Sequence, residues 1–451
     1  MTPFNVLNYP AWRPFTWPGV TAGALSAYAV LTFEPKLVFD FQTDTYKTGG
    51  ATSTFSSAIT HTRASSASMM NSSGTLVTVG NNVPRTGHHS YNGTAWVNEG
   101  ILHESEARTN LLLNSGDVLG TGWSSQGTGG STAGSVTAGS PFGTYQTLTP
   151  SASDSGSPAQ KYQIFKSITS GQTYVSSALL KHSVGTFWAV VDVYDTTSGS
   201  KRAWFDLQNG VVGTKDADVL QSGMIDYGDG WWLCWASATV SSNSGGFNSE
   251  LTKGDGILGR TFGDTMLIAG PQFELGTTPS SYIPTTSTTV TRAADLLTVP
   301  AANLPYDSTN MSIQMDGKMT YADTSGDNGK MFSWNLSNAD TIYSMLSTFQ
   351  ARTGAIYWVQ SASGVVDVVV GPDTSYSPDT NVPFNFASRH GSTFLNGAID
   401  GTALTADTTP TALPNLSSTD LNLGHGFMGT IGEFRMWDED ITDAGIVEAS
   451  T

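Results

Sequence analysis

The chain has 451 residues with 49 glycines, a charged fraction of 13% and a formal net charge of −17 at pH 7. A chain of this length is too long for one ordinary core and suits two or three domains. Its 20 Lys and Arg residues are dispersed along the chain, so no basic stripe is available to neutralise phosphates, and we expect no nucleic-acid partner.

The composition predicts an all-β protein, because Gly, Ser and Thr favour turns and strands over helices. No run approaches the roughly 18–20 apolar residues that a membrane helix needs. The N-terminus also lacks a basic start followed by an apolar run, so we expect no secretory signal, no membrane insertion and assembly in a cytoplasm. The single cysteine, Cys234, excludes an internal disulfide, and its neighbours in WWLCWA predict an inert core thiol.

Residues 1–41 are expected to form an arm that docks on a partner. In the segment YPAWRPFTWPG three prolines fix the backbone and remove hydrogen-bond donors, so the peptide cannot bury its own aromatic rings. The alternative is a tail that folds back on the first domain. A strand predicted at Lys36–Phe41 would continue the anchor. The rings expected to insert into the partner are Tyr9, Trp12, Phe15 and Trp17.

Residues 42–110 show little periodicity, and turn signals such as SSG and YNG divide them into short pieces. We therefore predict an extended linker with a few short strands. His88 and His89 lie in a Gly-flanked loop, but no third ligand follows at a metal-binding spacing. Solvated loop histidines are the prediction for this pair.

Residues 111–295 change to short strands separated by Gly, Ser, Asn and Asp, which predicts a β-sandwich or jelly roll. In FWAVVDVYD (Phe187–Asp195) side chains alternate between faces, so Ala189, Val191 and Val193 would point into the core. In DYGDGWWLCWASATV (Asp226–Val240) both faces carry tryptophan and would be covered. The tryptophans predicted as core are Trp231, Trp232 and Trp235.

The strand KRAWFDL (Lys201–Leu207) repeats the design of Phe187–Asp195. A hairpin through TTSGS should place Trp204 opposite Asp192 and Arg202 opposite Tyr194. Aromatic rings among carboxylates and a guanidinium are the mixture that sugars select. The alternative is that a strand, loop or subunit covers this face. The predicted glycan-binding residues are Trp188, Asp192, Tyr194, Arg202, Trp204 and Asp206.

Four segments of this region carry a resemblance to a known family: YQIFKSITSGQTYVSSALLK, AWFDLQNGVVG, DYGDGWWLCW and PQFELGTTPSSYIPTTSTTVTRAADLLTV, which spans Pro271–Val299. They resemble the jelly-roll module, similar to carbohydrate-binding modules, that recurs in head-spike and tail-fibre proteins of tailed bacteriophages. Upstream, Thr62–Arg85 followed by ESEARTNLLLNS (Glu104–Ser115) is similar to a segment of the same proteins, and we interpret Glu104–Ser115 as a hinge. The resemblance implies an appendage that binds glycan or the host surface.

Residues 296–451 predict a second β unit. The dipeptide Asn396–Gly397 is a strong hairpin signal, and GTIGEFRMWDEDITDAGI reads as a closing strand with an acidic turn. These segments resemble the concanavalin A-like laminin-G sandwich, and members of that family often bind sugars or proteins, sometimes through calcium. Asp323 and Asp327 have oxygen-rich spacing, but no Glu completes an EF-hand-like cage, so calcium stays an alternative and no other cofactor is expected.

No active site is predicted. A polysaccharide-cleaving enzyme needs two carboxylates about 5–10 Å apart across a cleft. The motifs GxSxG and HExxH and a phosphate-cradling loop are absent. We therefore expect no catalytic residue and no metal site. The densest acidic cluster, expected to be a solvated turn, is Asp438, Glu439, Asp440 and Asp443.

These patterns together predict a structural virion protein, a head spike or tail fibre of a tailed bacteriophage. The N-terminal arm would attach to capsid or tail proteins, and the β units would bind host cell-surface polysaccharide. Many copies raise the effective concentration of weak contacts, so we expect a homo-oligomer, with a trimer as the habit of the resembled family. The alternatives are a capsid decoration protein that binds no glycan and a polysaccharide depolymerase.

Overall fold

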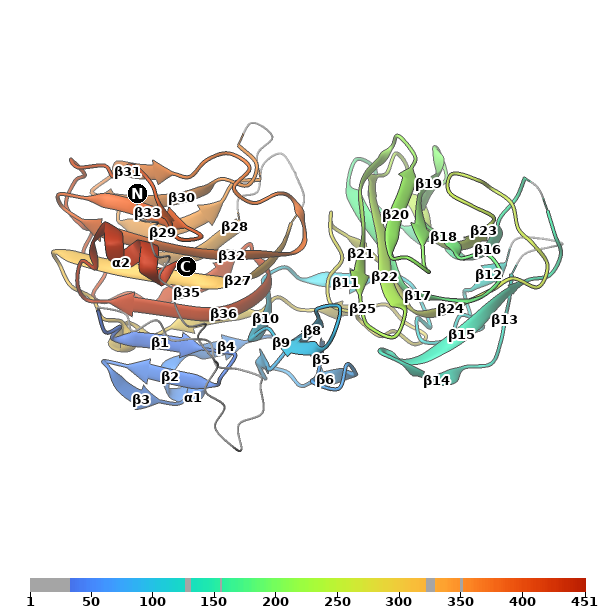
Figure 1. Cartoon of the computed structure of the whole chain (residues 1–451), viewed down its shortest axis with the longest axis horizontal. Helices are drawn as coiled ribbons and strands as arrows, with labels where there is room; N and C mark the ends of the chain where they lie inside the picture. The colour runs from blue at the N-terminus through green and yellow to red at the C-terminus, as the bar shows by residue number, and fades with distance from the viewer. Residues whose placement is uncertain (1–32, 126–130, 155, 322–328, 349–351) are drawn as a thin grey trace, which may run out of the picture.

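The computed structural model describes residues 33–125, 131–154, 156–321, 329–348 and 352–451. These residues form an all-β protein with two lobes (Figure 1). One lobe begins at residue 33, is interrupted and resumes at residue 295, and we call it the split sandwich. The other lies between residues 108 and 292, and we call it the inserted sandwich. The predicted sites that lie outside the described residues are Tyr9, Trp12, Phe15, Trp17, Asp323 and Asp327.

The split sandwich packs two antiparallel sheets around one apolar core. The larger sheet has the order β3 (Ala51–Ser53), β2 (Thr45–Thr48), β1 (Leu37–Asp40), β36 (Met428–Trp437), β27 (Asn310–Tyr321), β32 (Asp379–Gly391), β33 (Leu395–Ile399) and β34 (Thr402–Ala403), with β10 (Ile101–Glu104) on β36 and β7 (Arg85–Thr86) on β10. The smaller sheet has the order β31 (Val365–Val370), β30 (Ile356–Ala362), β29 (Thr341–Leu346), β28 (Gly329–Asn335), β35 (Leu421–His425), β26 (Leu296–Val299) and β4 (Thr60–Thr62).

The first described strands correct the prediction of an extended linker at residues 42–110. β1 pairs with β36 so that Phe39 lies opposite Phe434, and their rings stack with centroids 6.2 Å apart. β10 pairs with the other half of β36, and β4 pairs with β26. These strands cover a sheet edge that would otherwise expose unpaired backbone groups. The strand predicted at Lys36–Phe41 exists, but it belongs to this core rather than to an anchor (Figure 1).

The inserted sandwich has its own core between two antiparallel sheets. One has the order β12 (Ser124–Ser125), β16 (Ala159–Ser167), β23 (Ser244–Thr252), β18 (Trp188–Asp195), β19 (Gly199–Asp206) and β20 (Val211–Lys215). The other has the order β13 (Ser131–Ala133), β15 (Gly143–Pro150), β24 (Thr265–Leu275), β17 (Thr173–Val184), β22 (Trp231–Thr239) and β21 (Val219–Asp226), with β14 (Thr137–Ser140) on β15. Ala189, Val191 and Val193 are fully buried here, as predicted.

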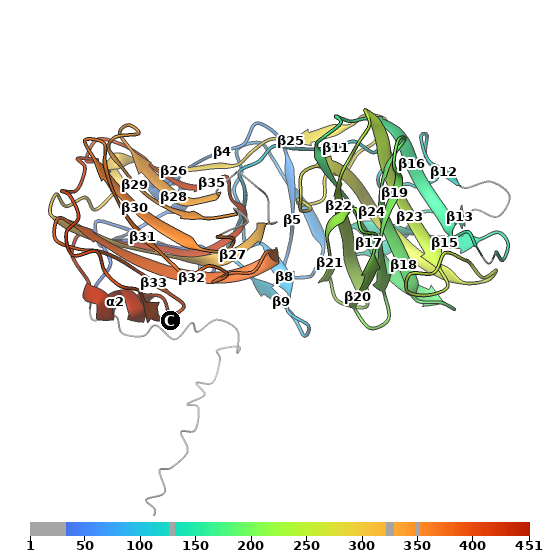
Figure 2. The same cartoon turned by 90° about the horizontal axis from the view of Figure 1, so that it is seen from above.

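The other regular elements of the described residues are three two-stranded sheets and three short helical segments. The two-stranded pairs are β11 (Arg108–Asn110) with β25 (Val290–Arg292), β5 (Ala67–Met70) with β6 (Leu76–Val79), and β8 (His89–Tyr91) with β9 (Trp96–Asn98). The helices are α1 (Phe55–Ala58), the 3-10 turn at Ala301–Asn303 and α2 (Thr442–Ala449). β5, β8 and β9 lie between the lobes, as both views show (Figures 1 and 2).

The hairpin predicted at Asn396–Gly397 is wrong. Both residues lie inside β33, and Gly397 is required there because an added Cβ would come within 2.4 Å of the buried Trp358 ring. The tight turn is at Asp400–Gly401, where φ is 46° and 74°. Positive φ at both central residues is what a type I′ turn requires, and Asp-Gly suits it.

The chain crosses between the lobes twice, and a buried ionic cluster joins the two crossings. Glu104 lies at the outward crossing and Asp295 at the return crossing. Arg85 donates to Glu104 at 2.6 Å and also to Asp295. Arg63 donates to Asp295 at 3.0 Å, and Arg292 Nε lies 3.2 Å from Glu104 Oε2. The segment interpreted as a hinge is therefore a crossing held by paired buried charges.

Candidate glycan-binding face

The predicted sugar-binding residues lie on one face of the six-stranded sheet of the inserted sandwich. Strand alternation turns this face away from the core because Ala189, Val191 and Ala203 point the other way. We call it the outer face. Its side chains from β16, β23, β18 and β19 are Gln160, Tyr162, Asn248, Glu250, Trp188, Asp192, Tyr194, Arg202, Trp204 and Asp206.

The register of the β18–β19 hairpin differs from the prediction by two residues. Arg202 lies opposite Asp192, whereas Trp204 lies opposite Val190. The cause is the turn, because β19 begins at Gly199, whose φ is 78°, directly opposite Asp195. A three-residue loop that ends in a left-handed glycine is a common hairpin connection. The shift keeps every side chain on its predicted face, because two residues are one full strand period.

Three of the six predicted residues are buried, and the two aspartates among them have hydrogen-bond partners. Asp192 accepts hydrogen bonds from the Lys201 amide at 2.8 Å and from Asn248 Nδ2 at 3.0 Å. Asp206 accepts from the two amides that follow it in its turn. Trp204 is 5% exposed. These side chains support the face but do not offer free surface to a ligand.

Trp188, Tyr194 and Arg202 are half-buried and stay accessible. The Trp188 ring crosses β19 and reaches β20, where an added Cβ on Gly213 would come within 2.6 Å of it. Gly213 thus leaves room for the ring, which lies over the ends of β18 and β19. An aromatic ring in this position offers an apolar surface on which a pyranose can stack.

Arg202 and Glu250 form the charged centre of the outer face. Arg202 Nε lies 3.2 Å from both carboxylate oxygens of Glu250, and Gln160 Nε2 donates to Glu250 Oε1 at 2.7 Å. Burial raises the pKa of Glu250 to about 7, against the opposing effect of Arg202. The two terminal nitrogens of Arg202 donate to no described residue, so they remain available to hydroxyl groups of a ligand.

Sequence reasoning missed Gln160, Tyr162, Asn248 and Glu250. They lie on β16 and β23, which pair with each other and with β18 across large sequence separations. Alternation alone could place Asn248 and Glu250 on one face of their strand. No sequence signal shows that this strand is the neighbour of β18, because only hairpin partners can be paired from adjacent segments.

The remaining predicted positions have clear outcomes. Trp231, Trp235 and Cys234 are buried as predicted, and burial raises the pKa of the Cys234 thiol, whereas Trp232 is only partly buried. The acidic cluster is not purely solvated, because Arg389 pairs with Asp440 at 2.8 Å and with Asp443 at 2.7 Å. His88 is not a solvated loop histidine: its Nδ1 accepts from the Met70 amide, and burial lowers its pKa to about 3.

Nowhere in residues 33–451, outside the gaps stated above, do three or more His, Cys, Asp or Glu side chains gather as a metal ion requires. In the same part of the chain, no helix has the length and apolar character needed to cross a membrane.

Comparisons with known proteins give likeness of fold only. No family model matches the sequence, and no curated protein matches it. Among solved structures, a leech intramolecular trans-sialidase shares 16% identity over 32% of this chain with a TM-score of 0.26, and the match spans 23% of that enzyme. The CBM40 of Ruminococcus gnavus IT-sialidase shares 12% identity over 32% of this chain and 84% of its own, with a TM-score of 0.26. Domains LG4-5 of mouse laminin α1 share 10% over 64% of this chain and 89% of their own, with a TM-score of 0.23.

Proposed function

We propose that this chain binds a cell-surface glycan through the outer face of the inserted sandwich. The observation that carries the proposal is the accessible set of Trp188, Tyr194 and Arg202 above a buried polar layer. The two rings supply apolar stacking surfaces, and the free guanidinium nitrogens supply donors in a fixed position. Glu250 lies 3.2 Å from Arg202 Nε and fixes the guanidinium from below, and Asn248 donates to the neighbouring Asp192 at 3.0 Å.

The fuller role that we propose is that of a bacteriophage appendage, a head spike or tail fibre. Its support is the similarity of Glu104–Ser115 and Pro271–Val299 to segments of such proteins, together with the absence of any motif for chemistry. In this proposal, residues upstream of 33 attach to capsid or tail proteins and several copies act together on the host surface. A trimer in the virion is part of the proposal.

Retention of the full chain on purified host capsule or lipopolysaccharide tests the glycan proposal. Trp188→Ala and Arg202→Gln should each reduce affinity about ten-fold, because one removes a stacking surface and the other the free donors. Trp188→Ala should unfold within a few degrees of the wild-type temperature. Arg202→Gln removes the cation that faces the buried Glu250 carboxylate, so it should unfold at a lower temperature, and its retention is measured well below that temperature. Phe262→Ala is the matched control, since this ring is 66% exposed and lies off the outer face.

Unchanged retention of both variants would exclude the outer face. Wild-type protein that binds no host glycan, but is present on particles, would favour the decoration alternative. Release of reducing ends from the capsule would favour a depolymerase instead.

A further inference from the structure

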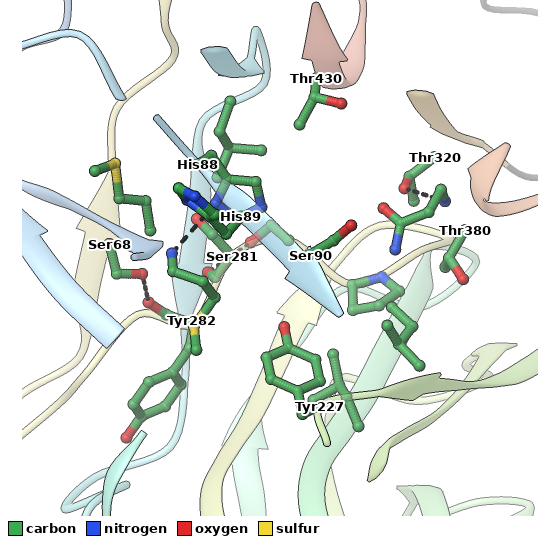
Figure 3. A pocket seen from close by; sticks show the side chains of 18 of the residues that line it. Ser68, His88, His89, Ser90, Tyr227, Ser281, Tyr282, Thr320, Thr380 and Thr430 are labelled. Atoms are coloured by element: carbon green, nitrogen blue, oxygen red, sulfur yellow. Dashed lines mark hydrogen bonds between the residues drawn. The ribbon is translucent and has the colours of Figure 1, made fainter. Parts of the chain in front are cut away.

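A cavity of about 100 Å³, separate from the outer face, lies where three parts of the chain meet. One wall is the β8–β9 hairpin, a second is the end of β21 in the inserted sandwich, and the third is formed by β32 and β36 of the split sandwich. Figure 3 shows His88, Tyr227 and Thr430 around this cavity on three separate ribbons. We call it the junction pocket. It shares no lining residue with the outer face.

Two hydroxyl groups of the junction pocket have no hydrogen-bond partner among the described residues. Thr430 is 5% exposed, and its hydroxyl makes no hydrogen bond within the described residues. A buried hydroxyl without a partner is unfavourable, and a hydrogen bond to a ligand group would remove that cost. The hydroxyl of Tyr227 also has no described partner, and burial raises its pKa well above the ordinary value, so it stays a neutral donor.

His88 presents a fixed donor on the same pocket. Its Nδ1 accepts from the Met70 amide at 3.2 Å, so the neutral ring carries its proton on Nε2. Burial lowers the pKa of His88 to about 3, and the ring therefore stays neutral at physiological pH. No described residue accepts a hydrogen bond from Nε2.

The charges at the junction pocket are already satisfied. Glu104 is paired with Arg85 and accepts from the Ser281 amide at 2.7 Å. Asp226 accepts from the Gly228 amide at 2.8 Å. No Lys or Arg lines the pocket among the residues that the structure describes. An ionic ligand would lose its hydration without gaining a counter-ion, so the pocket favours a neutral one.

Aromatic rings form part of the apolar lining of the pocket, beside aliphatic side chains such as Leu102 and Leu233. Trp96 lies between Tyr91, with centroids 5.7 Å apart, and Tyr227, at 5.9 Å. A cavity needs about 10–15 Å³ to hold one water molecule, so the junction pocket has room for roughly seven to ten water-sized groups. That is close to the size of one sugar ring with its hydroxyls, which also has an apolar face and neutral polar edges.

We propose that the junction pocket binds one residue of a neutral saccharide. The proposal goes beyond the outer face and does not depend on it. Because the walls come from both sandwiches and from β8–β9, a bound sugar contacts all three and holds them together. Binding should therefore raise the unfolding temperature of the whole chain by mass action.

The test is direct binding of monosaccharides to the full chain, measured by calorimetry and by thermal unfolding. The probes are glucose, galactose, mannose, rhamnose and N-acetylglucosamine, with glucuronic acid as the charged counterpart. At least one neutral sugar should bind and raise the unfolding temperature. Glucuronic acid should bind at least ten-fold more weakly than glucose, or not at all.

Thr430→Val and Tyr227→Phe keep the shape of their side chains and remove one hydroxyl each. Each should weaken the neutral sugar about five- to ten-fold while the unfolding temperature without sugar is unchanged or higher. Arg202→Gln on the outer face should leave this binding unaltered, which separates this proposal from the one above. The proposal is overturned if no neutral probe binds, if glucuronic acid binds as tightly as glucose, or if both pocket variants bind like wild type.

Discussion

Two buried glutamates show how local pairing decides the charge state of the same residue type. Burial raises the pKa of Glu250, and Arg202 only partly offsets this, so the pKa is about 7. Burial also acts on Glu104, but there Arg292 and Arg85, together with donors from Ser281, lower the pKa to about 2. One carboxyl group is therefore near its titration point at neutral pH, whereas the other is firmly ionised.

Glu250→Gln should remove a pH dependence that the wild type has. The folded-state pKa of about 7 lies above the ordinary value of 4.5, so the native state holds the proton more tightly than the unfolded chain. This contribution is complete below pH 4.5 and is lost as the pH rises through 7. The free energy of unfolding of the wild type relative to the variant should fall by up to about 3 kcal/mol over this range. Urea titrations at stepped pH measure it, and a constant difference would contradict the assignment.

At the scale of strands, the alternation of side chains between the two faces was sufficient to predict a pair of strands where the two are neighbours in sequence. It predicted β18 and β19, the face of each side chain and the buried tryptophans of β22. It found β1 but gave it the wrong role, and it missed the pairing of β4 and β10, because each of the three is only three or four residues long and pairs with a strand hundreds of residues away. Such pieces have no period of their own. They are explained only by the sheet edges that they cover, which are β36 for β1 and β10 and β26 for β4.

The hairpin predicted at Asn396–Gly397 was wrong for a different reason. A dipeptide that suits a turn also suits any place where a strand must approach a large ring, and Trp358 lies against Gly397. The outer face could be predicted only in part for a similar reason. Glu250 and Gln160 reach Arg202 from strands that no hairpin connects to β19, so nothing local indicates them.

Deletion from the N-terminus should separate an attachment arm from the folded core at one position. Removal of residues 1–32 leaves β1 intact, so the unfolding temperature should stay within a few degrees of wild type. Removal of residues 1–40 deletes β1 and exposes the edge of β36, together with the ring of Phe434. This shorter chain should unfold at a much lower temperature or aggregate. Calorimetry of both proteins is the measurement, and equal stability would contradict the role of β1.

The same pair of deletions sharpens the virion proposal. Particles should lose the protein when residues 1–32 are removed, although the protein itself still folds. Normal incorporation of that protein would exclude the N-terminal arm as the attachment point, whatever the glycan assays show.

At the scale of the whole molecule, the inserted sandwich interrupts the split sandwich, so the chain crosses between the two lobes twice instead of running through one domain after another. A single linker would leave the lobes free, whereas two strands that cross side by side restrict their relative motion. The crossings are joined by Glu104 and Asp295, which share the guanidinium of Arg85. Buried ion pairs contribute little net stability compared with apolar packing, but loss of one partner leaves an uncompensated charge. The cluster therefore favours one geometry of the crossings over others.

Arg85→Met should be severely destabilising for this reason. The variant keeps most of the apolar stem of the side chain but removes the cation that Glu104 and Asp295 share. Both carboxylate side chains are under 5% exposed. Breaking such a pair typically costs about 3–5 kcal/mol. Arg389→Met is the matched control, since it also breaks two ion pairs, but with Asp440 and Asp443 at 26% and 52% side-chain exposure. Its loss should stay below about 1–2 kcal/mol, because solvent screens those pairs. Chemical denaturation measures the free energy of unfolding of both variants. Limited proteolysis of Arg85→Met should cut the crossings, near residues 105–107 and 293–294, before it cuts within either sandwich. Equal stability losses in the two variants would show that the cluster does not hold the crossings together.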